Sequence, residues 1–233
     1  MPRVDNRPLT ADPTLMGNIQ SEVAAESRPL LMFITKYAKV LVGIIVLLIV
    51  ALVGTAIFRY VENSRQEETL DAMAKIMARP ADAQQIADLE KLGQDCPASM
   101  RSAVAVSLAQ SAAAQNNREK AAEAYGIVAQ ADYDSPLGLA AAINQAGEML
   151  SSGRYAEGVK VLQALQPRLT QETGLQVKMM LAEGAARAGD HELAAKTYED
   201  LAATAATDLD REYSATRAME LRAMAKAGKA EAE

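Results

Sequence analysis

The sequence is poor in the residues that build catalytic and metal-binding sites. Its 233 residues include one cysteine, one histidine, two phenylalanines and no tryptophan. Because Cys96 has no second cysteine to pair with, an intrachain disulfide is excluded, and no His/Cys cluster has metal-ligand spacing. There is no glycine-rich phosphate loop, and no serine or cysteine nucleophile has an evident base. We therefore expect no enzyme, no metal, no cofactor and no small-molecule substrate.

Positive charge is scarce in the larger, C-terminal part of the chain. The whole sequence has 24 Lys and Arg residues against 30 Asp and Glu residues. Residues 1–39 hold five of the basic and four of the acidic residues, which leaves 19 against 26 and a formal net charge of −7 beyond them. Phosphate binding requires a basic surface, so this part of the chain is not expected to bind nucleic acid.

One long apolar run stands out from the polar sequence around it. Val40 to Phe58 contains 19 uncharged, almost wholly apolar residues between Lys39 and Arg59. At about 1.5 Å per residue, a helix of this length covers roughly 28 Å, close to the hydrocarbon thickness of a bilayer. No small-residue cleavage site follows the run, so it is predicted to be an uncleaved signal anchor.

Charge alone does not orient this anchor. The twenty residues before the run and the twenty after it carry three Lys or Arg residues each. A long C-terminal domain translocates with little regard to its charge, which permits a cytoplasmic N-terminus. One face of the run is predicted to pack on another transmembrane helix, because its two glycines would admit close approach. The residues of this face are Gly43, Leu47, Val50 and Gly54.

A repeat emerges after Pro97, in a sequence rich in Ala, Glu, Gln, Lys and Met that favours helix. Three turn signals recur at spacings of 37 and 36 residues, each followed by a small residue and then by a large one. A small residue lets two antiparallel helices approach closely, and such hairpins must stack to bury their apolar faces. The turns are Asn116-Asn117, Gly153-Arg154 and Gly189-Asp190, the small residues are Ala121, Gly158 and Ala194, and the large ones are Tyr125, Leu162 and Tyr198.

These patterns predict an all-α protein in which one N-terminal transmembrane helix precedes an α-solenoid of about three helical hairpins and a capping helix. The only histidine, His191, follows the third turn and is expected to pack over it. The predicted segments are a mostly disordered tail (1–35), a transmembrane helix (36–60), linker helices (61–96) and a repeat domain (97–233) with repeats at about 102–135, 139–170 and 175–206 and a cap at 208–228.

The repeats resemble degenerate tetratricopeptide repeats. Leu108-Ala109 before the first turn and Leu181-Ala182 before the third carry this resemblance, whereas the middle copy departs from it at Gln145 and Gly158. The layout of tail, single span, "FRYVENSRQ" exit and acidic repeat domain further resembles the ancillary subunit family of the bacterial SecYEG translocon. That resemblance implies a single-pass inner-membrane protein with a cytoplasmic N-terminus and a periplasmic repeat domain, associated with translocon subunits and with periplasmic chaperones or clients.

The tetratricopeptide resemblance also indicates a binding face. In such folds the first helix of each hairpin lines a concave groove, which here is expected to be apolar and to take an apolar segment of a client. The recurring methionines are expected mainly in the core, and some of them on an adaptable binding face. The predicted groove residues are Val106, Gln110, Ile143, Leu150, Met179, Glu183 and Arg187, with Ala103, Ala113, Ala140, Gly147 and Gln176 beside them.

Two functions remain open at this point. The repeat domain is either a protein–protein interaction module that recruits chaperones or clients at the Sec translocon, or a structural scaffold or assembly factor of another envelope complex, such as one for cytochrome maturation or cell division. The alternative for the groove residues is that they pack on neighbouring helices. The sequence leaves the partner, the oligomeric state and the roles of the tail and of Cys96 open.

Overall fold

The protein, described by a computed structural model over residues 13–232, is helical throughout its regular structure. No strand occurs among these residues, so the predicted all-α class is confirmed. The backbone is already helical from Pro13, within the tail that was expected to be mostly disordered, while residues 1–12 lie outside the described part. The α-helices are α1 (Pro13–Met77), α2 (Ala83–Asp95), α3 (Arg101–Ala114), α4 (Arg118–Ala131), α5 (Pro136–Ser151), α6 (Tyr155–Leu165), α7 (Gln171–Arg187), α8 (His191–Ala203) and α9 (Asp208–Ala232), and the short 3₁₀ helices are η1 (Ala98–Met100) and η2 (Gln166–Arg168).

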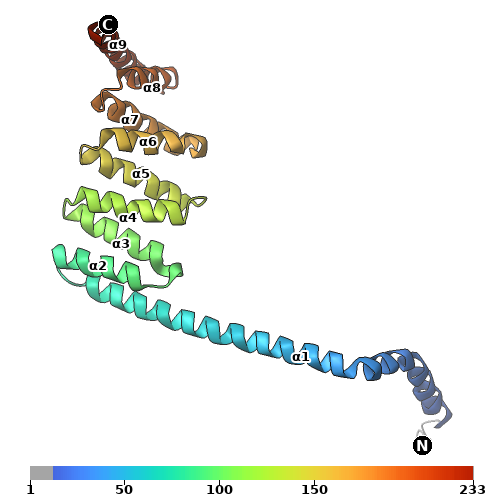
Figure 1. Ribbon diagram of the computed structural model, residues 1–233. Helices are drawn as coiled ribbons and strands as arrows, with labels where there is room; N and C mark the ends of the chain where they lie inside the picture. The colour runs from blue at the N-terminus through green and yellow to red at the C-terminus, as the bar shows by residue number, and fades with distance from the viewer. Residues whose placement is uncertain (1–12, 233) are drawn as a thin grey trace, which may run out of the picture. The chain divides into compact units, whose positions relative to one another are not determined.

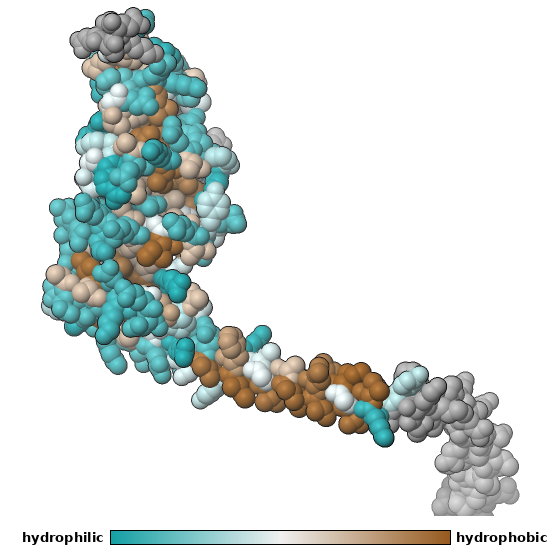
Figure 2. Space-filling view, in the orientation of Figure 1, coloured by the Kyte–Doolittle hydropathy of each residue, from teal (hydrophilic) through white to brown (hydrophobic). Residues whose placement is uncertain are grey.

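The chain divides into two units, one ending at Val61 and one from Glu62 to Glu233. The first unit contains a helical stretch, beginning at Val42, that is long and apolar enough to cross a membrane. Its large apolar side chains are exposed, and Figure 2 shows them as a hydrophobic surface along the helix. Exposure of such a surface to water is unfavourable, because removing each methylene group from water lowers the free energy by about 0.8 kcal/mol.

The second unit is a stack of helices, with α2 to α9 following one another in chain order (Figure 1). Two clusters of buried residues form its core, and fully buried leucines stand at the centre of each. In the first cluster these are Leu162, Leu181 and Leu221, and in the second Leu89. Alanines fill most of the remaining core positions, so the helices approach closely, as the small-residue pattern of the sequence predicts.

The three predicted turns share one backbone geometry. Asn116, Gly153 and Gly189 have positive φ angles of 59°, 84° and 82°. After each of them, the next residue donates its N–H to a carbonyl five positions back: Asn117 to Ala112 at 2.8 Å, Arg154 to Met149 at 2.9 Å and Asp190 to Ala185 at 2.9 Å. This pattern is the Schellman motif, in which a left-handed residue ends the helix. The repeated turn signal therefore identifies the end of α3, α5 and α7.

Replacing Gly189 with alanine is expected to destabilise the protein by roughly 1–2 kcal/mol, because a left-handed conformation forces the Cβ against the following carbonyl. The measurement is thermal unfolding of the full-length protein in detergent, followed by circular dichroism. Gly189→Asn is the matched control and should lose less, since asparagine adopts the same conformation at Asn116. Unchanged melting of Gly189→Ala would contradict the assignment of this turn.

Residues expected to form linker helices contribute to the core of the second unit. Met73 and Ile76, near the end of α1, pack against the cluster that contains Ile86 and Leu89 of α2. The Nε2 atom of Gln85, a residue only 3% exposed, donates to the carbonyls of Ile76 and Arg79 at 3.3 Å each. The last carbonyls of a helix lack hydrogen-bond donors within the helix. The Gln85 side chain supplies such a donor at the end of α1. The end of α1 and α2 thus form a further helical hairpin.

Two hydrogen bonds to sulfur attach α1 to α3. The hydroxyl of Ser107 donates to Sδ of Met73 at 3.3 Å, and that of Ser111 donates to Sδ of Met77 at 3.6 Å. The donors are four residues apart on α3 and the acceptors four residues apart on α1, so each pair lies one helical turn from the other. The expectation that the recurring methionines lie mainly in the core is wrong, because alanines take most core positions: Met149 is buried, whereas Met77, Met179, Met219 and Met224 are exposed.

The middle repeat compensates for its departures from the tetratricopeptide pattern. Gln145 of α5 stands where a leucine is expected, and its amide nitrogen lies 2.6 Å from the place where a Cβ at Gly126 of α4 would be. The glycine therefore makes the room that the longer polar side chain needs. Close packing requires such matched volumes, because interiors have few voids.

Candidate partner-binding surface

The predicted groove residues differ in how far they reach the surface. Gln110, Met179 and Arg187 are exposed, whereas Val106 and Glu183 are half-buried. Among the smaller neighbours, Ala103, Ala140 and Gln176 are exposed and Ala113 and Gly147 are half-buried. On α3 and α5 the exposed positions therefore carry alanine or glutamine. Of the predicted set, only Met179 is a large apolar side chain at the surface.

Of the predicted groove residues, Ile143 belongs to the interior instead, and Leu150 is half-buried against the core. Ile143 is 7% exposed and is a member of the larger core cluster. Leu150 reaches over two glycines, since its Cδ2 lies 2.9 Å from the place of a Cβ at Gly158 and 2.7 Å from that at Gly184. It fills the space that these glycines leave between α5, α6 and α7. The helical register alone does not distinguish these residues from groove residues. The burial of each side chain depends on whether the facing helices carry small residues at the point of contact.

Three of the large apolar side chains that are exposed in the repeats, Leu175, Met179 and Tyr213, lie around a pocket of about 400 Å³ at the C-terminal end of the stack. We call it the α7–α9 pocket, because its walls come from α7, α8, α9 and the α8–α9 connection. Met179 and Glu183 of the predicted groove both line it. The full lining is Leu175, Met179, Glu183, Tyr198, Leu201, Thr204, Ala205, Ala206, Asp210, Tyr213 and Ser214.

Local sequence signals position the three helices that carry this pocket. Thr170 caps α7 in a capping box with Thr173, and the carboxylate of Asp190 accepts from the N–H of Leu193 at the start of α8. At the start of α9, the hydroxyl of Thr207 accepts from the N–H of Asp210 at 3.1 Å. These side chains satisfy N–H groups that the first turn of a helix leaves unpaired. The pocket is thus built on ends of helices whose positions are fixed.

Two tyrosines meet in the pocket wall. The rings of Tyr198 and Tyr213 are 6.4 Å apart with an interplanar angle of 79°, an edge-to-face contact that aromatic pairs favour. Tyr198 is 5% exposed and Tyr213 is 62% exposed, so the pair leads from the core to the surface. Burial, together with Tyr213 and Glu183 nearby, raises the pKa of Tyr198. Arg217 of α9 also interacts with this hydroxyl and opposes the shift.

Two exposed apolar residues of the pocket, Leu175 and Tyr213, were not among the predicted groove residues. Leu175 stands one turn before Met179 on α7, so a wider apolar stripe on that helix could have revealed it. Tyr213 lies in the predicted capping helix, which the concave-face analogy leaves out. Its position became evident only when α9 was seen packed on α8, where the carboxylate of Glu199 accepts from Nε and Nη2 of Arg222 at 2.6 and 2.7 Å.

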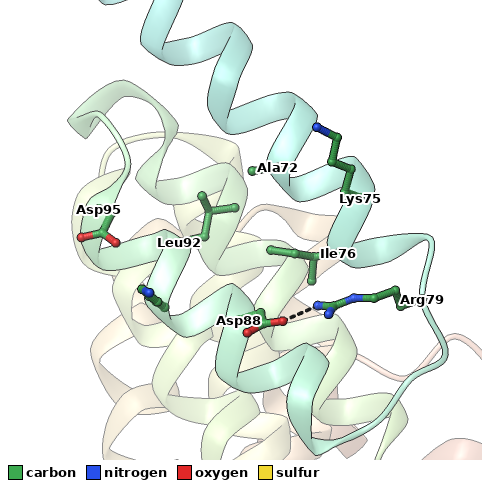
Figure 3. A pocket seen from close by; sticks show the side chains of 8 residues that line it. Ala72, Lys75, Ile76, Arg79, Asp88, Leu92 and Asp95 are labelled. Atoms are coloured by element: carbon green, nitrogen blue, oxygen red, sulfur yellow. Dashed lines mark hydrogen bonds and ion pairs between the residues drawn. The ribbon is translucent and has the colours of Figure 1, made fainter.

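A second hollow, of about 460 Å³, lies between the end of α1 and α2. Figure 3 shows Lys75 and Ile76 from α1 on one side and Asp88 and Leu92 from α2 on the other. The guanidinium of Arg79 bonds the carboxylate of Asp88, which lowers the pKa of that carboxyl. None of the predicted groove residues lines this hollow, and its ion pair joins the two helices of the first hairpin.

The four residues of the predicted transmembrane packing face lie in the exposed part of α1. Gly43, Leu47, Val50 and Gly54 are all exposed, and a Cβ added at either glycine would have no neighbour within 4 Å. Packing of another helix here stays a prediction. Cys96, in contrast, is 7% exposed, and burial raises the pKa of its thiol. Within the described range, no three His, Cys, Asp or Glu residues are grouped so that they could hold a metal ion.

Comparison with known proteins identifies the class of fold that the stacked hairpins define. The chain belongs to the tetratricopeptide repeat-like domain family, which matches residues 32–173, more than half of its length. Proteins of this fold generally mediate protein–protein interactions. No curated protein and no solved structure matches the chain. The family match begins before the apolar run and ends within the first turn of α7, so the α7–α9 pocket lies beyond the matched residues.

Proposed function

We propose that this protein is a membrane-anchored protein–protein interaction module whose α7–α9 pocket holds an apolar segment of its partner. The observation that carries the proposal is the exposure of Leu175, Met179 and Tyr213 around one pocket of a tetratricopeptide-like domain. Large apolar side chains gathered at one exposed site are typical of surfaces that another protein covers.

The anchor in this proposal is the apolar stretch of α1. Its length and composition suit a bilayer, and the family match includes it, which supports a span as a regular part of such chains. The N-terminus would lie in the cytoplasm of a bacterium and the repeat domain in the periplasm. The domain would then meet partners at the outer face of the inner membrane.

The layout of the chain supports one location within that membrane. A short tail, a single span and a small acidic repeat domain are the arrangement in which the chain resembles the ancillary subunit of the Sec translocon. We therefore place the protein at the translocon, where it would recruit periplasmic chaperones or clients. A scaffold role in another envelope complex is the competing assignment, and the partners themselves decide between the two.

Met179→Glu is expected to abolish co-purification of partners and to change the free energy of unfolding by only about 0.5 kcal/mol or less, because Met179 is 56% exposed. Tagged full-length protein would be isolated from native membranes and its partners identified by mass spectrometry. Ile143→Glu is the contrasting variant: it places a charge in the core and should unfold the domain.

The identity of the partners completes this experiment. Loss of translocon subunits and periplasmic chaperones from Met179→Glu preparations would support the proposal. Loss of cytochrome-maturation or division proteins would favour the scaffold assignment. Retention of every partner by a folded Met179→Glu variant would show that recruitment does not use the α7–α9 pocket.

A further inference from the structure

We propose that the α7–α9 pocket recognises a partner segment in which a lysine or arginine stands beside a bulky apolar residue, with the cationic side chain placed on the ring of Tyr213 between the carboxylates of Asp210 and Glu183. This inference rests on the proposed function and adds the chemical class of the segment. Three features of the pocket carry it: an apolar side, an exposed aromatic ring, and a lining whose charged groups are all acidic.

The apolar side is formed by α7. Leu175 and Met179 are each 56% exposed and stand four residues apart, so they lie one above the other on a single face of the helix. Leu201 of α8 closes the pocket as a buried residue. A leucine-sized side chain of a partner would cover both exposed residues at once, and the flexible thioether of Met179 adapts to its shape.

The aromatic ring belongs to α9. Tyr213 is 62% exposed, and its edge-to-face contact with the buried Tyr198 holds it in place. The face of an aromatic ring attracts a cation, with arginine and lysine as the usual partners. The ring orientation is therefore fixed before a partner arrives, which lowers the entropy cost of binding.

Two carboxylates line the pocket together with this ring. Asp210 is three residues before Tyr213 on α9 and thus on the same face, and Glu183 approaches from α7. The carboxylate of Asp210 accepts a hydrogen bond from the Thr207 hydroxyl at 2.6 Å and that of Glu183 accepts from Nε of Arg187 at 2.8 Å. An ionised carboxylate has about four lone-pair sites, so both groups retain acceptor capacity for an incoming cation.

The surrounding arginines leave Asp210 as the carboxylate of the lining that has no basic partner. Arg187 pairs with Glu183 and partly offsets its charge, whereas Arg211 and Arg217 of α9 pair with carboxylates outside the lining, and Arg217 also interacts with Tyr198. The pairs are Arg187–Glu183 at 2.8 Å, Arg211–Asp208 at 2.7 Å and Arg217–Glu220 at 2.9 Å. The lining of the pocket contains no lysine or arginine, so the field at Tyr213 favours a cation.

An adjoining hollow indicates which way the partner segment runs across the α7–α9 pocket. It shares Leu175 and Thr204 with the α7–α9 pocket and is lined on its other side by Lys178. Like charges repel, so a second cation of the partner is disfavoured beside Lys178. The basic residue of the segment therefore lies toward α9, and its apolar residue toward α7.

The test uses full-length protein in lipid nanodiscs and three short synthetic peptides that share a leucine core and carry lysine, glutamine or glutamate at one flanking position. Binding is measured by fluorescence anisotropy. The lysine peptide is expected to bind about tenfold more tightly than the glutamine peptide. The glutamate peptide should bind most weakly, and only the lysine peptide should lose affinity strongly with added salt.

Variants of the pocket test which residues produce the preference for lysine. Tyr213→Leu keeps an apolar side chain but removes the ring, and Asp210→Asn keeps a hydrogen-bond acceptor but removes the charge, so each should erase the preference for lysine. Glu212→Gln is the matched control, because Glu212 is an exposed carboxylate on α9 that does not line the pocket. Circular dichroism confirms that each variant is folded, and Asp210→Asn decides the test should Tyr213→Leu unfold.

The outcomes separate this inference from the proposed function. Equal affinity for the three peptides, or a lysine preference that survives both Asp210→Asn and a folded Tyr213→Leu, overturns the cation site and leaves an apolar-binding module. Absence of binding by all three peptides, or binding that Met179→Glu does not weaken, argues against the α7–α9 pocket itself.

Discussion

Gly138→Ala is expected to destabilise the protein by about 3 kcal/mol or more, at or above the upper end of typical overpacking costs. A Cβ at Gly138 would lie 2.0 Å from the carbonyl oxygen of Asp132 and 2.6 Å from its carbon. These are backbone atoms, so no side-chain rotation can relieve the contact. The α4–α5 turn would have to move away from the start of α5.

That turn is held by several bonds at once. The N–H of Ser135 donates to the carbonyl of Asp132 at 2.9 Å, and the N–H of Gly138 donates to the hydroxyl of Ser135 at 3.1 Å. Arg168 of η2 reaches across and places its guanidinium 4.2 Å from the ring centroid of Tyr133. Displacing the turn therefore disturbs the junction between the α3–α4 and α5–α6 hairpins as well as the start of α5.

Thermal unfolding of full-length protein in detergent measures this effect, with Gly174→Ala as the matched control. Gly174 lies in α7, and a Cβ there would meet nothing within 4 Å. Alanine should stabilise that position by about 0.5–1 kcal/mol, because glycine is a poor helix former. Similar melting temperatures for the two variants would contradict the close approach at Gly138.

Ala194→Leu, in the α7–α8 hairpin, is expected to cost about 1–3 kcal/mol of the free energy of unfolding. Ala194 is 0% exposed in α8, five residues after the turn glycine, at the position where Ala121 and Gly158 stand in the other repeats. Leucine at this point would push α8 away from α7. Since α8 also forms a wall of the α7–α9 pocket, binding of the lysine peptide should weaken together with stability.

Ala156→Leu is the control for this prediction, because Ala156 is exposed on α6 and leucine is nearly as good a helix former as alanine. Its free energy of unfolding should stay within about 0.5 kcal/mol of the wild-type value. Ala121→Leu should behave like Ala194→Leu. If both buried substitutions left unfolding unchanged, the repeat register would be refuted.

Recurring local signals made most of the second unit predictable. The three predicted hairpin turns each need a residue that tolerates positive φ, and Asn116, Gly153 and Gly189 recur for that reason. The first hairpin escaped prediction because its turn has no such residue and because Ile86 occupies the place of the small residue. The residue that caps α2 nevertheless follows the repeat spacing, since Asp82 precedes the cap residue Asn117 by 35 residues. The Asp82 side chain accepts a hydrogen bond from the N–H of Gln85.

The binding surface was predictable only in part. Met179 and Glu183 follow from the helical register of α7, and both line the pocket. Ile143 has the position on α5 that Met179 has on α7, yet it is buried, and Leu150, two turns further on, is half-buried against the core. Whether such a residue is buried depends on the size of the side chains on the facing helices. Leu150 faces Gly158 and Gly184, which lie 8 and 34 residues further along the chain.

The sequence by itself determined the helical class, the apolar stretch, the repeat period and the turns, because each depends on residues within a few positions of one another and on their intrinsic conformational preferences. Only the tertiary structure decided where on the surface a pocket forms. The α7–α9 pocket joins Met179 to Tyr213, on helices separated by α8, and its exposure results from how closely the small residues let those helices pack. Such packing depends on the combined shape of several helices, which no local pattern records.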